Sequence, residues 1–278
     1  LSLLLFLIRW IAHRLTPRPP EPDRHSPIVR RIIRESSSTH ANLALLGDKR
    51  LLLDETQTAF VMYASAGGSW ISMGDPVGPR ERWPELAWRF RELADLEGKR
   101  VVFYEVPRES LPLYEDLGLT ALPIGEEAQV ALREFTISGR QNHDLRSARN
   151  RMRREGWQFR LLPAEDLERY IPKLRSVSDA WLASKRARER GFALGTFDPD
   201  YLRSFPIAVV EREDELIAFA NLWESADRSE ASVDLMRHTP DSPSQTMDFL
   251  FVELMERERE LGFQTFNLGL TPLSGMDQ

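Results

Sequence analysis

Asp234 is the residue of this chain whose setting most strongly indicates chemistry. It lies in residues 233–237 (VDLMR), which otherwise read as a buried strand. An ionised carboxylate taken out of water costs several kcal/mol unless it is paired with a cation or put to use. Asp234 is therefore the first candidate catalytic residue, and Arg237 is the second.

The spacing of Asp234 and Arg237 raises a geometric condition. Residues three apart on a regular strand point to opposite faces of the sheet. Both side chains therefore reach one site only if the strand ends or bulges between them. A structural ion pair is the alternative role for these two residues.

The elements around Asp234 are readable over residues 229–275, which predict a strand, a long loop, an amphipathic helix, a strand and a tight turn. The helix has apolar residues at i, i+3, i+4, i+7 and i+8 from Met247, which form a single face. Thr246 is the expected N-cap of this helix and Gly262 its expected end.

Three polar residues on these elements are candidates for binding substrate. Asp248 lies in the first helical turn, where helix capping explains an acid equally well. Asn267 lies in the last strand and Ser274 in the turn after it. A Gly-Pro turn near a strand end can also place such groups for structural reasons alone.

Arginines gather in residues 140–154, which hold six arginines and no lysine. Arg146, Arg149 and Arg153 share one stripe of a predicted helix, and Arg151 lies beside them. A second basic cluster occupies residues 185–190. Both could be solvated faces, but a local basic ridge on a chain of net charge −6 also suits a polyanion held at one place.

Composition excludes several classes of site. The chain has 278 residues, 42% of them hydrophobic and 29% charged, as in a globular protein with one large or two ordinary domains. It has no cysteine, which excludes disulfides, a thiol nucleophile and thiolate-bound metals. The five histidines are scattered, and neither a GxSxG elbow nor a Walker P-loop occurs. We expect no metal and no cofactor.

The first 25 residues predict a membrane attachment. Residues 1–8 are almost wholly apolar and are followed by Trp10 and several arginines, while prolines dominate residues 17–27. Eight apolar residues are too few to span a bilayer, so we interpret them as the end of a transmembrane helix that emerges on the cytoplasmic side. An amphipathic helix packed on the domain is the alternative.

Two regions of the chain share one pattern at an offset of roughly 160 residues. Strands at 59–65 and 69–73, a helix at 83–96 and a strand at 101–106 parallel the strands, helix and strand between 216 and 268. The run of strand, strand, long loop, helix and strand resembles the central pattern of the Gcn5-related acetyltransferase fold. The fold class is predicted as α/β (α+β), with two tandem Gcn5-related acetyltransferase-like domains of mixed sheets flanked by helices. The expected divisions are a membrane-helix end and linker at 1–25, an N-terminal domain at 26–128 and a catalytic C-terminal domain at 129–278. Asp75 of the first copy falls in a loop, so only Asp234 is expected to be a costly buried carboxylate.

The loop before the second helix is poorly suited to coenzyme A. In the acetyltransferase fold a glycine-rich loop wraps the pyrophosphate with backbone N–H groups. Residues 238–245 (HTPDSPSQ) contain no glycine, an aspartate and two prolines. An enzyme with this loop is expected to use another acyl donor.

Several segments between residues 42 and 275 have specific sequences, among them NLALLGDK from residue 42, WISMGDPVGP from 70, GEEAQVALREF from 125, GFALGTF from 191, MDFLF from 247 and FNLGLTPLSG from 266. In these segments the chain resembles the cytoplasmic domain of the bacterial aminoacyl-phosphatidylglycerol synthases, the multiple peptide resistance factor family. Each segment is weak alone, but their number and order make the resemblance specific.

The resemblance implies transfer of an amino acid, alanine or lysine, from aminoacyl-tRNA to phosphatidylglycerol. It implies an N-terminal transmembrane domain in the same protein, and a location at the bacterial inner membrane with this domain facing the cytoplasm. The added ammonium group would lower the negative charge of the membrane and give resistance to cationic antimicrobial peptides. The tRNA would bind the arginines at 146, 149, 151 and 153.

Under this resemblance Asp234 would bind the α-ammonium of the aminoacyl group or act as a base. Arg237 would steady a phosphate or the developing oxyanion. The chain departs from the family at Gln245, where a glycine is expected, and in the turn after Asn267. The family also continues beyond residue 278, so further functional residues are expected there.

Other function classes remain open. A peptidoglycan-type transferase would share the aminoacyl-tRNA donor and the fold, and an N-acetyltransferase would require coenzyme A. A lipid-binding regulatory domain is the alternative that is not an enzyme.

Overall fold

The structure is a computed structural model that describes residues 23–275, which form two compact units. The first unit contains residues up to Ile33 and Gly47–Leu122, and the second contains Arg34–Leu46 and the chain from Pro123 onward. The expected boundary at residue 128 differs from this division, because residues 125–131 form a strand of the second sheet. The expected membrane-helix end and most of the linker lie in residues 1–22, outside the described residues.

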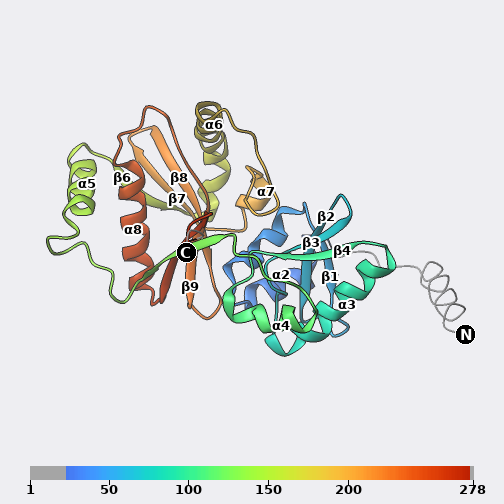
Figure 1. Cartoon of the computed structure of the whole chain (residues 1–278). Helices are drawn as coiled ribbons and strands as arrows, with labels where there is room; N and C mark the ends of the chain where they lie inside the picture. Colours follow the sequence, from blue (N-terminus) through green and yellow to red (C-terminus); the bar gives the residue numbers. More distant parts are fainter. Residues whose placement is uncertain (1–22, 276–278) are drawn as a thin grey trace, which may run out of the picture. The chain divides into compact units, whose positions relative to one another are not determined.

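The first unit is built on a four-stranded sheet in the order β1-β2-β3-β4 (Figure 1). Its elements are α2 (Pro27–Glu35, whose last two residues belong to the second unit), β1 (Arg50–Leu53), β2 (Phe60–Ala66), β3 (Ser69–Met73), η2 (Arg80–Arg82), α3 (Trp83–Leu96), β4 (Arg100–Tyr104), η3 (Arg108–Ser110) and α4 (Leu111–Asp116). β1, β2 and β3 pair antiparallel, whereas β3 and β4 are parallel. A parallel pair requires a crossover, and α3 supplies it.

The second unit is built on a six-stranded sheet in the order β5-β10-β9-β8-β7-β6. Its elements are η1 (Thr39–Leu46), β5 (Gly125–Ala131), α5 (His143–Arg154), β6 (Gln158–Leu162), η4 (Ala164–Asp166), α6 (Leu167–Lys185), α7 (Pro199–Leu202), β7 (Ile207–Arg212), β8 (Glu215–Glu224), β9 (Glu230–His238), α8 (Thr246–Glu260) and β10 (Thr265–Pro272). β9 and β10 are parallel and are joined through α8, while the other neighbours are antiparallel.

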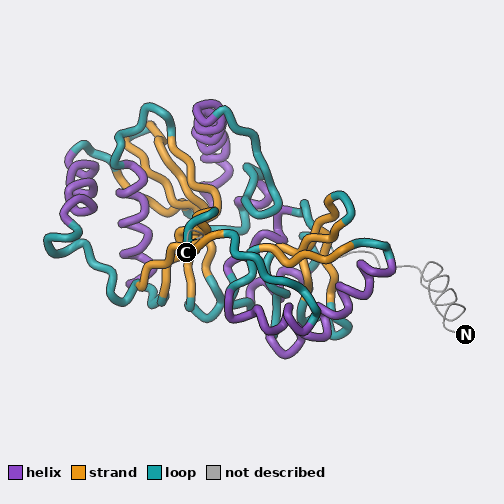
Figure 2. The backbone as a smooth tube through the Cα atoms, viewed as in Figure 1, coloured by secondary structure: helices purple, strands orange, loops and turns teal. Residues whose placement is uncertain are grey.

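The two units repeat one topology, as the sequence pattern predicted. β2-β3-α3-β4 and β8-β9-α8-β10 each consist of an antiparallel pair, a crossover helix and a parallel strand. The predicted fold class, two mixed sheets flanked by helices, is confirmed (Figure 2).

The second sheet is covered on both faces, which fixes the direction of every side chain along its central strands. On β7, Ala208 and Val210 pack in the cluster that contains residues of α5 and α8. Ile207 and Val209 pack in the cluster that contains residues of α6 and α7. A side chain on β9 therefore points either toward α8 or toward α6.

Asp75, which follows β3, is desolvated, so the expectation that only Asp234 would be a costly buried carboxylate was wrong. Its carboxylate accepts hydrogen bonds from Ser110 Oγ at 2.6 Å and from the Tyr114 hydroxyl at 2.5 Å. Burial raises the pKa of Asp75, although the two hydrogen bonds act against it. The first unit thus also contains a desolvated carboxylate, which bonds the η3–α4 segment to the end of β3.

Candidate active site

A β-bulge in β9 turns Asp234 and Arg237 toward the same face of the sheet. Ala220 of β8 pairs with Met236, but Leu222 pairs with Val233, so Asp234 and Leu235 together stand opposite one residue of β8. Val233 packs in the α8 cluster and Leu235 in the α6 cluster, although residues two apart on a regular strand share a face. Residues three apart on a strand can reach one site only if the strand ends or bulges between them, and β9 has such a bulge between Asp234 and Arg237.

The half-buried carboxylate of Asp234 is fixed by two donors on the α6 side. Gly195 donates its backbone N–H to Oδ1 at 2.6 Å, and the Tyr201 hydroxyl donates to Oδ2 at 2.7 Å. Tyr201 is fully buried. Its burial is the largest cause that raises its pKa well above the usual value, and the charge of Asp234 is the second. Tyr201 therefore stays protonated and keeps donating.

Arg237 is 3% exposed and is held by a carboxylate from the chain segment that follows α6. Its Nη1 and Nη2 donate to the two oxygens of Glu189 at 2.8 and 2.7 Å, and Nη1 also donates to Ser178 Oγ. The guanidinium lies 5.4 Å from the ring centre of Trp181. Planar two-point bonds of this kind are the strongest that arginine makes with a carboxylate.

Glu189 is in turn held by more than Arg237. Burial alone would raise its pKa, but the hydrogen bonds and charge of Arg237 and the N–H of Phe197 lower it overall, so it remains ionised. The Phe197 N–H donates to Glu189 Oε1 at 3.2 Å. Residues 185–198, named here the 185–198 segment, are thus bonded to β9 twice, through Glu189 to Arg237 and through Gly195 to Asp234.

Asn267 is buried in β10 beside a second acidic group. Its Nδ2 donates to Glu230 Oε2 at 3.0 Å, and its Oδ1 accepts the Gly269 N–H at 2.8 Å. Thr39 donates to the other oxygen of Glu230. Ser274 donates to Glu126 at 2.7 Å. These contacts account for both residues structurally, and neither bonds the Asp234 carboxylate.

Asp248 is exposed in the first turn of α8, as expected for an acid at a helix N-terminus. The N-cap prediction was wrong, because Gln245 occupies the cap position and no side chain caps the helix. Thr246 begins the helix instead, and its buried hydroxyl has no hydrogen-bond partner among the described residues. The loop before it brings proline and serine, rather than glycine, to the helix start.

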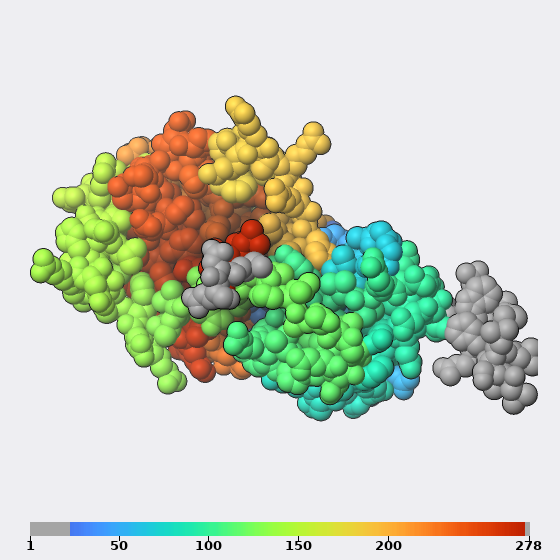
Figure 3. Space-filling view, viewed as in Figure 1, coloured from blue at the N-terminus to red at the C-terminus, as the bar shows by residue number. Residues whose placement is uncertain are grey.

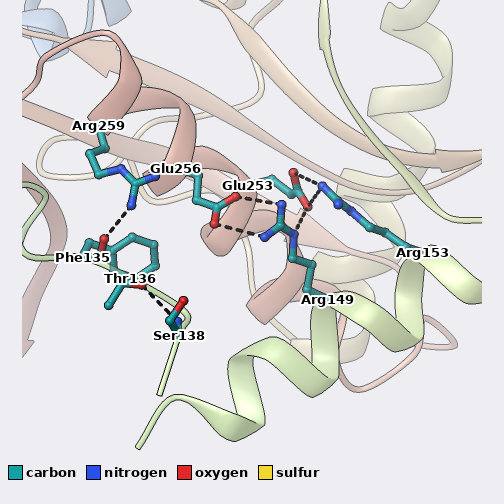
Figure 4. Close-up of polar contacts among 8 residues, drawn as sticks. All are labelled: Phe135, Thr136, Ser138, Arg149, Arg153, Glu253, Glu256 and Arg259. Atoms are coloured by element: carbon teal, nitrogen blue, oxygen red, sulfur yellow. Dashed lines mark hydrogen bonds and ion pairs between the residues drawn. The ribbon is translucent and has the colours of Figure 1, made fainter. Parts of the chain in front are cut away.

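Two of the three arginines in the predicted stripe on α5 form ion pairs with carboxylates of α8 (Figure 4). Arg149 lies between Glu253, at 3.0 Å, and Glu256, at 2.8 Å. Arg153 bonds Glu253 at 2.8 Å. These pairs join two helices on one face of the sheet, which is a structural use of the charges.

The other two arginines predicted to bind tRNA lie differently. Arg146 donates to the carbonyls of Ile137 and Gly139, and it forms no ion pair with a carboxylate within residues 23–275. Arg151 pairs with Glu155 one turn later, on the exposed side of the helix. An open hollow of about 550 Å³ follows this side of α5. It is lined by His143, Arg146, Ser147, Asn150, Arg153 and Arg154.

The family model for the C-terminal part of phosphatidylglycerol lysyltransferase matches residues 30–278. The chain belongs to this family. The phosphatidylglycerol lysyltransferase of Bacillus subtilis (strain 168) is 34% identical over 278 residues, which are 98% of this chain but only 32% of that protein. The chain thus spans about a third of the length of this relative.

Two solved structures of similar domains share the fold. A C-terminal domain from Agrobacterium fabrum is 40% identical, with a TM-score of 0.85 over 88% of this chain and 78% of that one. L-PGS from Bacillus licheniformis is 35% identical, also with a TM-score of 0.85, over 94% of this chain and 80% of that one. The predicted resemblance to this family is confirmed.

Three residues around Asp234 and Arg237 were missed from the sequence. Gly195 belongs to GFALGTF, a segment that carried the family resemblance, so it had a signal of its own. Glu189 and Tyr201 had none, because each lies more than 30 residues from its partner in β9 and meets that partner only through folding. Within residues 23–275 no helix is long and apolar enough to span a membrane. In the same range no cluster of histidine and acidic side chains is arranged to hold a metal ion.

Proposed function

We propose that this chain is the catalytic domain of an aminoacyltransferase that moves an amino acid from aminoacyl-tRNA to a glycerol hydroxyl of phosphatidylglycerol. The family match and the names of its relatives support this function, with lysine as the first candidate amino acid and alanine as the second. The structural observation that carries it is the bulge in β9, which turns Asp234 and Arg237 to one face.

In the proposed reaction the lipid hydroxyl oxygen attacks the carbonyl carbon of the aminoacyl ester. A new ester bond to glycerol forms, the bond to the ribose oxygen breaks, and one proton passes from the lipid hydroxyl to that oxygen. The donor ester is already activated, so catalysis consists mainly of positioning, proton transfer and stabilisation of the oxyanion.

Asp234 is proposed to bind the α-ammonium of the aminoacyl group or to accept the hydroxyl proton. Its two donors, Gly195 and Tyr201, fix the direction of the carboxylate before substrate arrives. Arg237 is given a narrower role than the sequence suggested. Because Glu189 occupies both of its terminal nitrogens, Arg237 acts as a positioning residue that holds the 185–198 segment beside Asp234.

The cellular role follows from the charge of the product. An aminoacylated lipid gains an ammonium group, which reduces the negative charge of the membrane surface and its attraction for cationic peptides. We place the domain on the cytoplasmic face of the bacterial inner membrane, next to an N-terminal transmembrane domain of the same protein.

The test supplies lysyl-tRNA and alanyl-tRNA, each with a labelled amino acid, together with phosphatidylglycerol vesicles. It is run with this chain and with the B. subtilis relative carrying this chain in place of its matched region. We expect label in the lipid fraction, and Asp234→Ala should abolish it. Asp214→Ala, which removes an exposed carboxylate from the β7–β8 turn, is the matched control and should not.

Two results would refute the assignment. Absence of lipid-borne label with every donor, from folded protein, excludes the proposed acceptor. Full activity of Asp234→Ala excludes the proposed site. Label that appears only in a peptidoglycan precursor, or only with acetyl-coenzyme A, would identify one of the rival transferases instead.

A further inference from the structure

The 185–198 segment has a surface that the proposed chemistry does not use. Four cations stand in its first six residues, Lys185, Arg186, Arg188 and Arg190, and all are exposed. None of them pairs with a carboxylate among the residues that the structure describes. We propose that this segment docks the domain onto an anionic lipid bilayer.

The acids close to these cations are engaged elsewhere. Glu189, in the middle of the run, turns to the buried guanidinium of Arg237. Asp198 accepts the N–H of Asp200 at the start of α7, and Asp200 pairs with Arg203. Within the segment, four exposed cations therefore stand against the carboxylates of Glu189 and Asp198, and Glu189 is paired with Arg237, so the outward charge of the segment is net positive. Three of the five arginines on α5 differ, because Arg149, Arg151 and Arg153 have carboxylate partners.

An exposed apolar residue follows the cations and decides the kind of partner. Leu194 is 55% exposed, directly before Gly195. Cations beside exposed apolar side chains match the interface of a bilayer, which offers anionic headgroups and hydrocarbon at adjacent depths. An RNA backbone offers the phosphates but no apolar phase for Leu194. The segment lies at the surface of its unit, yellow to gold in Figure 3.

The position of the segment gives the docking a consequence. Gly195, one residue after Leu194, donates its N–H to Asp234. A bilayer that contacts Leu194 therefore lies beside the carboxylate proposed to act on the lipid hydroxyl. This consequence rests on the proposed function, whereas the binding of a bilayer does not require any turnover.

The absence of cysteine allows a direct test. Leu194→Cys provides one thiol for an environment-sensitive fluorophore, and Leu122→Cys, at a residue 79% exposed in the first unit, is the matched control. Vesicles of phosphatidylglycerol mixed with phosphatidylcholine should shift the emission of the label at residue 194 to shorter wavelength. Pure phosphatidylcholine vesicles, or the label at residue 122, should give no shift. Equal shifts at the two positions, or none at residue 194, would overturn the proposal.

Charge removal gives the second test, by co-sedimentation with the same mixed vesicles. Each cation near an anionic surface contributes about fivefold to binding, so replacing Lys185, Arg188 and Arg190 by glutamine should weaken binding on the order of a hundredfold at low salt. The control replaces Arg140, Arg151 and Arg154 by glutamine, which changes the net charge equally, and should weaken vesicle binding less than fivefold.

Equal losses of vesicle binding in the two variants would show a nonspecific charge effect and refute the proposal. Binding of tRNA is measured for the same variants. If the variant at residues 185, 188 and 190 loses tRNA binding but keeps vesicle binding, the proposal is refuted in favour of a nucleic-acid partner. Failure of aminoacyl transfer would refute only the proposed function.

Discussion

Gly195→Ala is expected to detach Asp234 from the segment that holds it. A Cβ atom on residue 195 would lie 1.8 Å from Asp234 Oδ2 and 2.6 Å from its Cγ. Contacts of a Cβ below 3.0 Å are essentially never observed, so the two residues must separate by more than about 1 Å. Gly195 has no left-handed backbone angle, so any effect arises from this collision and not from backbone strain.

The magnitude follows from the contacts that the separation breaks. The Gly195 N–H bonds Asp234 at 2.6 Å, and the same displacement disturbs the 2.7 Å bond from Tyr201. A hydrogen bond to a charged group contributes about 1.5–3 kcal/mol, and water can replace part of it because Asp234 is only half-buried. We expect the free energy of unfolding of the second unit to fall by about 2 kcal/mol. Misplacement of a reacting group by about 1 Å can reduce the rate of transfer about a hundredfold.

The assay combines denaturant unfolding with the rate of amino-acid transfer to vesicle lipid. Gly68→Ala is the matched control, because it has no heavy atom within 4 Å of the added Cβ and no left-handed angle either. It should change neither quantity. If Gly195→Ala keeps wild-type stability and transfers within threefold of the wild-type rate, Asp234 does not depend on this segment and the proposed site is wrong.

Three further predictions concern pH, helix packing and the 185–198 segment. Burial raises the pKa of Glu258 to about 7, above its unfolded value, so the ionised form destabilises the fold increasingly as pH rises from about 4.5 to 7. Glu258→Gln should therefore stabilise the protein by roughly 3 kcal/mol at pH 8 but not at pH 4, and equal denaturation midpoints at pH 8 would contradict this. Arg149→Ala should lower the free energy of unfolding by about 2 kcal/mol, because it leaves two largely buried α8 carboxylates without this partner, whereas Arg151→Ala, at an exposed pair, should change it by less than about 0.5 kcal/mol. Arg237→Lys keeps the charge but loses the two-point bond, so trypsin should cut the 185–198 segment several-fold faster, and an unchanged cleavage rate would show that Arg237 does not hold it.

The helices and the repeated topology were predictable because periodicity is a local signal. The apolar face of α8 is the clearest case, since Leu250, Leu254 and Met255 are buried as their spacing requires. The residue at which α8 starts was less predictable. Thr246 is a good cap by residue type, but the chain reaches the helix one residue earlier, and the hydroxyl is buried inside the first turn. Capping depends on the direction of the incoming loop, which no residue type encodes.

The partners of charged residues were the least predictable part of the site. Asp234 and Arg237 were chosen because a charge in an apolar strand is costly, and this criterion is local. Their partners Gly195 and Glu189 come from another part of the chain and depend on the packing of α6 against the sheet. The same limitation affected Arg149, whose helical stripe was visible but whose bonds to α8 were not.

The bulge itself has a physical cause in Arg237. On a regular strand Arg237 would share a face with Val233 and point into the apolar cluster under α8, where an unpaired guanidinium would cost several kcal/mol. One extra residue in β9 reverses the face, and Arg237 then meets Glu189 on the side of α6. The amide of Asn221 accepts the Leu235 N–H at 2.7 Å, which satisfies a donor at the bulge itself. The arginine that must avoid the α8 core therefore favours the same bulge that turns Asp234 toward Gly195 and Tyr201, so the two candidate residues share a site without needing to pair with each other.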